Sequence, residues 1–345
     1  MKTLKKESWK TIISGANLLG TGGGGTIKQA LKILKKMQKP VNIADFADLK
    51  DEDIVCTVFG IGGKENCDPI VASRNAFNYF QKIINKKVSA IIPVEVGPMA
   101  IANAAFIAGE LKMPLFDGDI VGLRSSPEVF LETITITSLD RTPCVIANDK
   151  GKFSILEKKI SIEKMEEFFR NFAISSGGDA FVAGYPLKIK SLKKVIPQGS
   201  ISVSKNTGLL LKKLKSKRIS LIEFCKNTGW VIFGIGKIID VQKNNSKGFC
   251  KGKYKIADKN GFFEVLFKNE NLVFLRNKKV VLTCPDSISL LDLLYFEGIN
   301  NFEENKNKEV AILGKKAIPI WRTSEGKKLF SPKNLGFNFN QKLLK

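Results

Sequence analysis

Residues 88–119, VSAIIPVEVGPMAIANAAFIAGELKMPLFDGD, carry the pattern of a strand, a helix and a second strand. The first segment, residues 88–94, is a short apolar run of the kind found in strands buried on both faces. Residues 98–111 are rich in alanine, which predicts a well-buried helix, and residues 114–116 form the next apolar run. This order of elements predicts a largely parallel α/β sheet.

The same alternation continues on both sides of this stretch. Before it, residues 54–60 form another buried-strand run, and residues 68–85 are amphipathic. After it come two predicted strands and a helix, at residues 134–138, 143–147 and 162–173. Residues 1–174 are therefore predicted to form an N-terminal α/β domain with a largely parallel sheet.

The pattern of predicted secondary structure changes after Gly177 and Gly178. Short β-like segments separated by turns follow, at residues 231–235, 238–241, 262–267, 272–275, 280–283 and 310–313. One helix is predicted within this part, at residues 203–214. Residues 175–345 are therefore predicted to form a mostly β C-terminal domain, and 345 residues are enough for two domains.

A run of glycines, Gly22 to Gly25, lies between two predicted helices. The first helix covers residues 8–19, and Thr26 with Gln29 forms a capping box that opens the second. The run lacks the Lys-Ser/Thr of a phosphate-binding P-loop, and no strand precedes it as in a dinucleotide-binding fold. Two interpretations stay open: free backbone N–H groups that contact a ligand, or a tight structural turn.

The net charge of +23 raises the question of nucleic-acid binding. Of the 56 basic residues, 7 are Arg and 49 are Lys, and the lysines are spread along the whole chain. Proteins that read bases or clamp phosphates favour the planar fork of Arg. The composition therefore predicts a lysine-rich solvated surface, with nucleic-acid binding as the least favoured function.

The sequence contains no histidine, which excludes Ser-His-Asp and Cys-His catalysis and any histidine ligand to zinc from within the chain. Acid–base chemistry must then use Asp, Glu, Lys, Tyr or Cys. The six cysteines form no Cys-x-x-Cys pair, so most are expected to be small buried hydrophobic residues. No apolar run is long enough to span a membrane and no apolar signal core follows the first residues, which predicts a cytoplasmic protein.

Carboxylates follow the predicted strands of the N-terminal half. Glu95 ends the first strand of the opening stretch, and Asp117 and Asp119 follow the second, with Arg124 shortly after. Ligands of open α/β sheets bind outside the carboxyl ends of strands. A third strand end adds candidate contacts to a substrate: Gly62, Gly63 and Cys67. The structural alternative is that such residues cap helices or form turns.

Six blocks of sequence, taken in order, resemble the S-methyl thiohydantoin desulfurase-like family. The first three are residues 20–25 (GTGGGG), 93–97 (PVEVG) and 114–119 (PLFDGD), the last followed by Gly122, Arg124, Pro127 and Glu128. In the C-terminal half they are 269–272 (NENL), 285–286 (PD) with 291–292 (LD), and 319–321 (PIW) with 336–337 (GF). The chain departs from the family pattern at Thr26, Pro98 and Ala100.

The resemblance implies an N-terminal α/β domain, a mostly β C-terminal domain, and hydrolytic removal of a methylthio group from a five-membered ring. It also implies a broader class of ring-amide substrates and a hydantoinase-like partner, beside a homo-oligomer as another option. The departures leave an alternative open: a divergent protein that binds a small metabolite without turnover, or a regulatory subunit.

The chemistry assigned to these residues is a hypothesis about proton transfer. Asp117 or Asp119 is the predicted base, and Glu95 is the acid or the anchor of a ring nitrogen. Arg124 and the N–H groups of Gly22 to Gly25 would stabilise negative charge. A nucleophilic Cys67 is a less favoured route. The sequence requires no cofactor. A divalent metal on the carboxylates stays an open alternative, although no residue spacing demands it.

Overall fold

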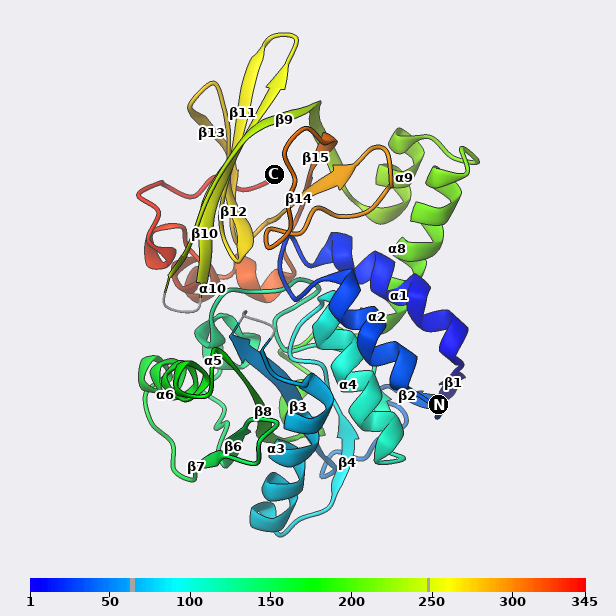
Figure 1. Ribbon diagram of the computed structural model, residues 1–345, viewed down its shortest axis with the longest axis vertical. Helices are drawn as coiled ribbons and strands as arrows, with labels where there is room; N and C mark the ends of the chain where they lie inside the picture. Colours follow the sequence, from blue (N-terminus) through cyan, green and yellow to red (C-terminus); the bar gives the residue numbers. More distant parts are fainter. Residues whose placement is uncertain (63–65, 247–248) are drawn as a thin grey trace.

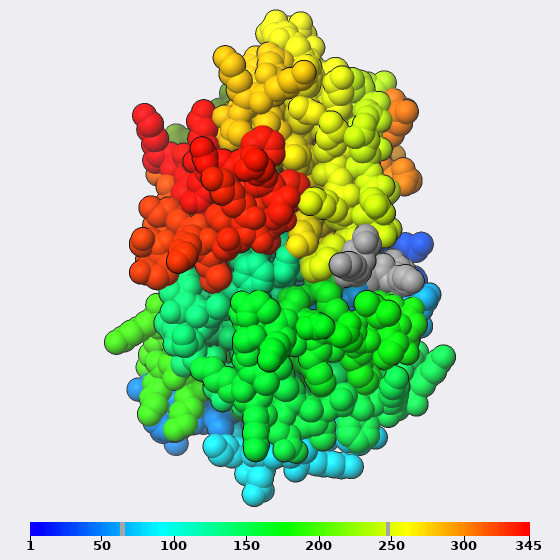
Figure 2. Space-filling view, turned by 90° about the vertical axis from the view of Figure 1, so that its left-hand side faces the viewer, coloured from blue at the N-terminus to red at the C-terminus, as the bar shows by residue number. Residues whose placement is uncertain are grey.

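The computed structural model describes residues 1–62, 66–246 and 249–345. Figure 1 shows two lobes, one built on a sheet covered by helices and one built on a long twisted sheet. In Figure 2 the C-terminal half, coloured yellow to red, lies directly on the N-terminal half, coloured cyan to green. The two-domain architecture predicted from the sequence is confirmed.

Within the described residues, eight strands form the N-terminal sheet in the order β1-β2-β5-β4-β3-β8-β6-β7. The pairs β2–β5, β5–β4 and β4–β3 are parallel, and β6 runs in the same direction because both β3 and β6 are antiparallel to β8. This confirms a sheet of mostly parallel strands. The strands are β1 (Lys2–Leu4), β2 (Val41–Ala44), β3 (Ile54–Gly62), β4 (Val88–Ile91), β5 (Leu115–Phe116), β6 (Cys144–Ala147), β7 (Phe153–Leu156) and β8 (Asp179–Lys188).

Helices cover both faces of this sheet, which explains the continuous apolar runs of its central strands. Cys56 and Val58 of β3 pack in the core with α1, α3 and α4, whereas Val55 and Phe59 pack against α6 on the other face. Side chains of a strand alternate between the two faces of the sheet, and helices cover each face, so both sets are buried. The helices are α1 (Lys6–Leu19), α2 (Ile27–Lys36), α3 (Pro69–Ile84), α4 (Pro98–Glu110), α5 (Thr133–Ile136), α6 (Ile162–Ser175) and α7 (Ile189–Leu192).

Helix α8 (Ser200–Lys215), which α9 (Leu221–Thr228) follows, crosses α1 at a distance that only glycine allows. A Cβ atom on Gly208 would lie 1.9 Å from the backbone oxygen of Thr11, and one on Gly15 would lie 1.9 Å from that of Ser204. The predicted boundary near Ser175 lies at the end of α6, and β8 joins the N-terminal sheet after it. The division of the chain at residue 175 stays a prediction.

The C-terminal sheet is antiparallel throughout, with seven described strands in the order β13-β12-β11-β10-β9-β15-β14. The segments predicted at 231–235 and 238–241 belong to one long strand with a bulge. The strands are β9 (Val231–Ser246), β10 (Phe249–Asp258), β11 (Gly261–Lys268), β12 (Glu270–Arg276), β13 (Lys279–Thr283), β14 (Ser287–Asp292) and β15 (Glu309–Lys315), and α10 is Ser324–Leu329. The mostly β character predicted for this half is confirmed.

One predicted strand is wrong. Residues 134–138 alternate Ile and Thr, which favours a strand, but the segment forms the single helical turn α5. The N–H and the Oγ of Thr133 both donate to the backbone oxygen of Ile120, at 2.8 Å each, and this anchor starts the turn.

The state of the cysteines agrees with the expectation that most of them are small buried residues. All six are free, and five are buried. No helix in the described part of the chain combines the length and the apolar character needed to cross a membrane.

Candidate functional site

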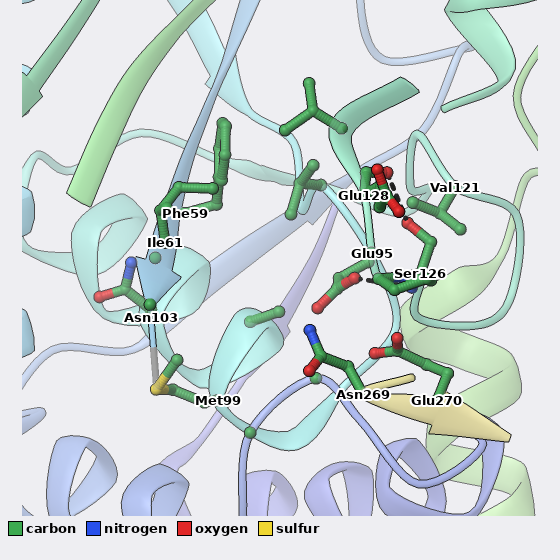
Figure 3. Close-up of a pocket in the computed structure, with 18 of the residues that line it drawn as sticks. Phe59, Ile61, Glu95, Met99, Asn103, Val121, Ser126, Glu128, Asn269 and Glu270 are labelled. Atoms are coloured by element: carbon green, nitrogen blue, oxygen red, sulfur yellow. Dashed lines mark hydrogen bonds between the residues drawn. The ribbon is translucent and has the colours of Figure 1, made fainter. Parts of the chain in front are cut away.

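A cavity of about 120 Å³ lies where the two lobes meet, outside the carboxyl ends of β3 and β4. That is space for several water molecules or one small ring. The glycine run, the first turn of α4, residues 126–132 and the start of β12 form its walls. Figure 3 shows a polar side with Glu95, Asn269 and Glu270 pointing toward one another, and an apolar side with Phe59, Ile61 and Met99.

The glycine run is held between the lobes, without room for side chains. A Cβ on Gly23 would lie 1.8 Å from Oε1 of Glu270, and one on Gly24 would lie 2.5 Å from the Cα of Gly97. Gly24 also has a φ of +71°, in the left-handed region that favours glycine. The carbonyl of Gly24 accepts from the N–H of Met99 at 3.0 Å, and that of Gly25 accepts from Nδ2 of Asn300 at 2.9 Å.

The backbone N–H groups of Gly24, Gly25 and Ala100, which line the cavity, are among those without a hydrogen-bond partner in the described part of the chain. Ala100 lies in the first turn of α4, where helical N–H groups are left unpaired and the helix dipole favours negative charge. These donors give the cavity a wall that suits an anion or a carbonyl oxygen.

Glu95 follows β4 and leads into α4. Its carboxylate accepts from the N–H of Ser126 at 3.1 Å. Burial raises the pKa of Glu95 to about 8, and the charges of Asp119 and Glu132 act in the same direction, whereas the Ser126 N–H and Arg124 lower it. Glu95 is partly exposed and lines the cavity, and the protein that surrounds the rest of the residue disfavours the charged form of its carboxyl.

Glu270 is the first residue of β12 and is 2% exposed. Its Oε2 has no hydrogen-bond partner in the described part of the chain. Burial raises the pKa of Glu270 well above its usual value, Glu95 raises it further, and Arg124 lowers it. Because the two carboxyls interact, they titrate as a pair, and burial favours the protonated form of each.

The other two glutamates that line the cavity have cationic partners. Glu128 forms an ion pair with Lys268, and Glu132 forms one with Arg141 at 2.7 Å. Among the described cavity carboxylates, Glu95 and Glu270 are therefore the two without an ion pair. Neutral or singly charged ligands fit such a site better than dianions.

Asn269 supplies a further donor at the cavity. Its Oδ1 accepts from the N–H of Cys250 at 2.8 Å, which fixes the orientation of the amide. Its Nδ2 then faces the cavity and has no partner among the residues that the structure describes.

The carboxylates of Asp117 and Asp119 point away from the cavity and hold the start of α8. Asp117 accepts from the N–H groups of Ile201 and Ser202, at 2.7 and 3.2 Å, and from Oγ of Ser202. Asp119 accepts from the N–H groups of Gly122 and Leu123 and from Oγ of Ser200. Burial raises the pKa of Asp119 to about 6. Neither aspartate lines the cavity.

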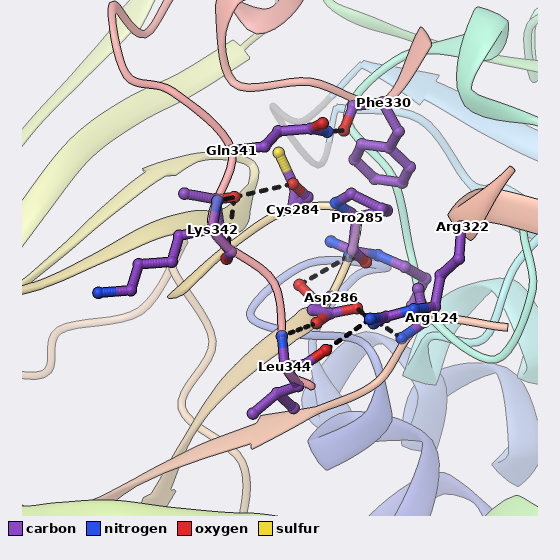
Figure 4. Close-up of polar contacts among 11 residues, drawn as sticks. Arg124, Cys284, Pro285, Asp286, Arg322, Phe330, Gln341, Lys342 and Leu344 are labelled. Atoms are coloured by element: carbon purple, nitrogen blue, oxygen red, sulfur yellow. Dashed lines mark hydrogen bonds and ion pairs between the residues drawn. The ribbon is translucent and has the colours of Figure 1, made fainter. Parts of the chain in front are cut away.

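Arg124 lies behind the cavity and joins the lobes, as Figure 4 shows. Its Nη1 donates to the backbone oxygen of Pro285 at 2.6 Å, and its guanidinium stacks over Phe330 at 4.5 Å. The neighbouring Asp286 binds Arg322 and the N–H of Leu344, both at 2.7 Å, so the C-terminal tail is fastened at the same place. Arg124 acts on Glu95 and Glu270 through its charge.

The remaining predicted residues are divided between two places. Gly62 lines the cavity, and Gly22 and Gly23 support it from behind. Cys67 lies in an adjoining cavity, and burial raises the pKa of its thiol to about 12, which makes it a poor nucleophile. Gly63 lies outside the described residues. No group of three or more Cys, Asp or Glu within the described residues is arranged to hold a metal ion.

Glu270 and Asn269 are not predicted as site residues from the sequence. They lie 145 or more positions after the other candidates, at a hairpin turn whose local pattern shows only a β structure. The one signal for them is that residues 269–272 carry part of the family resemblance.

Comparisons with known proteins cover the whole chain. Residues 7–158 match the S-Me-THD-like N-terminal domain, and residues 160–344 match the S-Me-THD-like C-terminal domain. A crystal structure of a protein from Chromobacterium violaceum has the same fold, with a TM-score of 0.83 over 100% of both chains at 17% identity. The comparison with curated proteins found no match. On the two domain matches, the chain belongs to the S-Me-THD-like family.

Proposed function

We propose that the protein is a hydrolase that acts on a small five-membered ring of the cyclic amide or thiohydantoin type and releases methanethiol from S-methyl thiohydantoins. One observation carries the proposal: two carboxyls without ion pairs, the partly exposed Glu95 and the buried Glu270, face a ring-sized cavity beside unpaired backbone N–H groups. Membership of the S-Me-THD-like family is consistent with a thiohydantoin-related substrate.

The reaction needs a base and an acid in one place. The oxygen of water bonds to the ring carbon that carries the methylthio group, and the carbon–sulfur bond breaks. Of the two protons of water, one ends on the ring nitrogen and the other on sulfur. A carboxyl pair that loses its first proton near neutrality provides both roles, because one member is ionised while the other is still protonated.

The hydrogen-bond partners of the two carboxyls suggest which carboxyl has which role. Burial raises the pKa of both carboxyls, that of Glu95 to about 8. We assign the ionised role to Glu95, because its carboxylate accepts the N–H of Ser126, which stabilises the charged form, whereas Oε2 of Glu270 has no partner among the described residues. Glu95 then takes one proton from water and gives it to the departing sulfur. Glu270 donates its proton to the ring nitrogen and regains one from the oxygen that came from water, which restores both carboxyls. The N–H groups of Gly24 and Gly25 bind the ring carbonyl and the charge that develops on it.

This assignment changes the roles of three residues predicted from the sequence. Asp117 and Asp119, the predicted base, become positioning residues, because α8 and the loop after Asp119 occupy their oxygens. Arg124 acts as a fixed positive charge that keeps one carboxyl of the pair ionisable. A homo-oligomer, a hydantoinase-like partner and a cytoplasmic location stay predictions.

A second function, binding of a ring metabolite without turnover, is favoured by one observation. Ala100, where the chain departs from the family pattern, lines the cavity directly. The difference at this position changes the wall next to the unpaired N–H groups. Ligand binding without product formation would distinguish this function from hydrolysis.

The test is methanethiol release from S-methyl thiohydantoins by the purified protein. We expect release by the wild type and a loss of at least about 100-fold in Glu95→Gln and in Glu270→Gln, the range seen when general acid–base groups are removed. Glu110→Gln is the matched control, because Glu110 pairs with Arg74 on the surface at 3.2 Å. Equal rates in all four proteins would contradict the assignment.

A further inference from the structure

A second cavity, the outer chamber, adjoins the site between α2 and α3. It measures about 470 Å³, roughly four times the cavity described above. Its wall is mostly apolar and includes Ile33, Pro69 and Ile70, and its rim carries Lys32 and Lys35. Ile33 and Ile70 are buried in the core, so the wall is fixed in place.

The two cavities share part of their lining. Gly60, Ile61, Gly62, Met99 and Phe181 belong to both. Gly60 belongs to this shared lining, and a Cβ there would lie 3.1 Å from Cε1 of Phe181 and 3.4 Å from Cε of Met99. A side chain at this position would therefore take up space between the two cavities.

Part of the shared lining lies on the side of the site opposite the carboxyls. In Figure 3, Ile61 and Met99 lie across the cavity from Glu95 and Glu270. A ring bound to the carboxyls therefore directs any substituent on its far side toward the outer chamber. The inner cavity has room for the ring alone.

We propose that the outer chamber binds an apolar substituent of the substrate ring, such as a branched alkyl or benzyl group. This inference rests on the proposed function and names the class of ring that fits it. The apolar wall gives affinity through burial of the substituent, which scales with the apolar area removed from water. At the rim, Lys36 is paired with Asp68 at 3.0 Å, which bridges α2 and α3 above the apolar wall.

The experiment is isothermal titration of the wild type with hydantoin and with its 5-methyl, 5-isobutyl, 5-benzyl and 5-carboxymethyl derivatives. We expect at least about tenfold tighter binding of the benzyl than of the unsubstituted ring, from the apolar area buried. Ile70→Asn, a variant of the outer chamber alone, is expected to lose this gain while binding unsubstituted hydantoin as before. Ile70→Leu, the matched control, is expected to keep it.

The outcomes separate this inference from the proposed function. If hydantoin binds and the benzyl group adds nothing in the wild type, the outer chamber is no subsite, while the ring site stands. Tighter binding of the carboxymethyl than of the benzyl ring would replace the apolar subsite by recognition of charge at the lysine rim. If none of the compounds binds, both the inference and the proposed function are overturned. The wild-type series decides the matter even if Ile70→Asn fails to fold.

Discussion

At the scale of single residues, the environment of a carboxylate decides its role more than its position in the sequence does. Glu95, Asp117 and Asp119 all follow strands and look alike in the sequence. In the structure the aspartates accept three hydrogen bonds each, whereas Glu95 accepts one and faces a cavity. Strand ends can be predicted from the sequence, but the donors that α8 brings to the aspartates cannot.

The raised pKa of Glu95 predicts an effect of pH on stability. A carboxyl whose pKa rises from 4.5 to about 8 on folding binds more protons in the folded state, so the wild type loses stability as pH rises between these values. In Glu95→Gln this loss is absent. Between pH 5 and pH 8, the free energy of unfolding of the variant should therefore rise relative to that of the wild type, by on the order of 1 kcal/mol per pH unit. Chemical denaturation of both proteins across this range measures the difference. A constant difference across this range would contradict the raised pKa.

A second prediction at the scale of single residues concerns Gly24. Gly24→Ala places a side chain at positive φ and against Gly97, so we expect a loss of about 1–3 kcal/mol from backbone strain alone and more from the collision. The matched control is Gly151→Ala, since Gly151 also has positive φ, at +84°, but has nothing within 4 Å of the added Cβ. Urea denaturation of both variants checks this. Equal losses would mean that the close approach to Gly97 does not matter.

At the scale of elements, the strand–helix–strand pattern of residues 88–119 predicts the core of the N-terminal sheet, because apolar runs at strand length can be buried only between two layers of helices. The order of the strands in the sheet is harder to predict from the sequence. Strand β8 lies beside β3, and the turn α5 occupies a segment with strand-like composition. Both depend on contacts between residues far apart in the chain.

A variant of Asp117 tests whether this residue stabilises the start of α8 or takes part in the reaction. Asp117→Ala removes the acceptor for two N–H groups at the start of α8, so we expect a loss of about 1–2 kcal/mol in stability. Because Asp117 does not line the cavity, kcat/KM per folded molecule should stay within about twofold of the wild type. Denaturation and methanethiol release measured on the same preparation check both values. A loss of activity near that of Glu95→Gln would restore Asp117 as the base.

At the scale of the whole molecule, the site exists only when the lobes are packed together. Glu95 comes from the N-terminal half and Glu270 from the C-terminal half, and the glycine run lies against both carboxyls. Local sequence patterns predict each lobe but carry no signal for this contact. This explains why Glu95 is predicted from the sequence and Glu270 is not.

Arg124 links the packing of the lobes to the chemistry. Arg124→Gln removes a positive charge that lowers the pKa of both Glu95 and Glu270, so the pair should release its first proton at a higher pH. If Glu95 must be ionised for activity, the rising part of the pH profile of kcat/KM should move to higher pH. An unchanged pH profile in a folded variant would show that the charge of Arg124 does not reach the pair.

The most direct test of the central claim, that Glu95 and Glu270 together hold a proton at neutral pH, is infrared difference spectroscopy of the carboxyl stretch. Spectra of the wild type minus Glu95→Gln and minus Glu270→Gln should each contain a protonated carboxyl band at pH 7. The band assigned to Glu95 should disappear as pH rises through about 8. If both difference spectra instead show only ionised carboxylates at pH 7, the pair cannot act as acid and base in the way proposed.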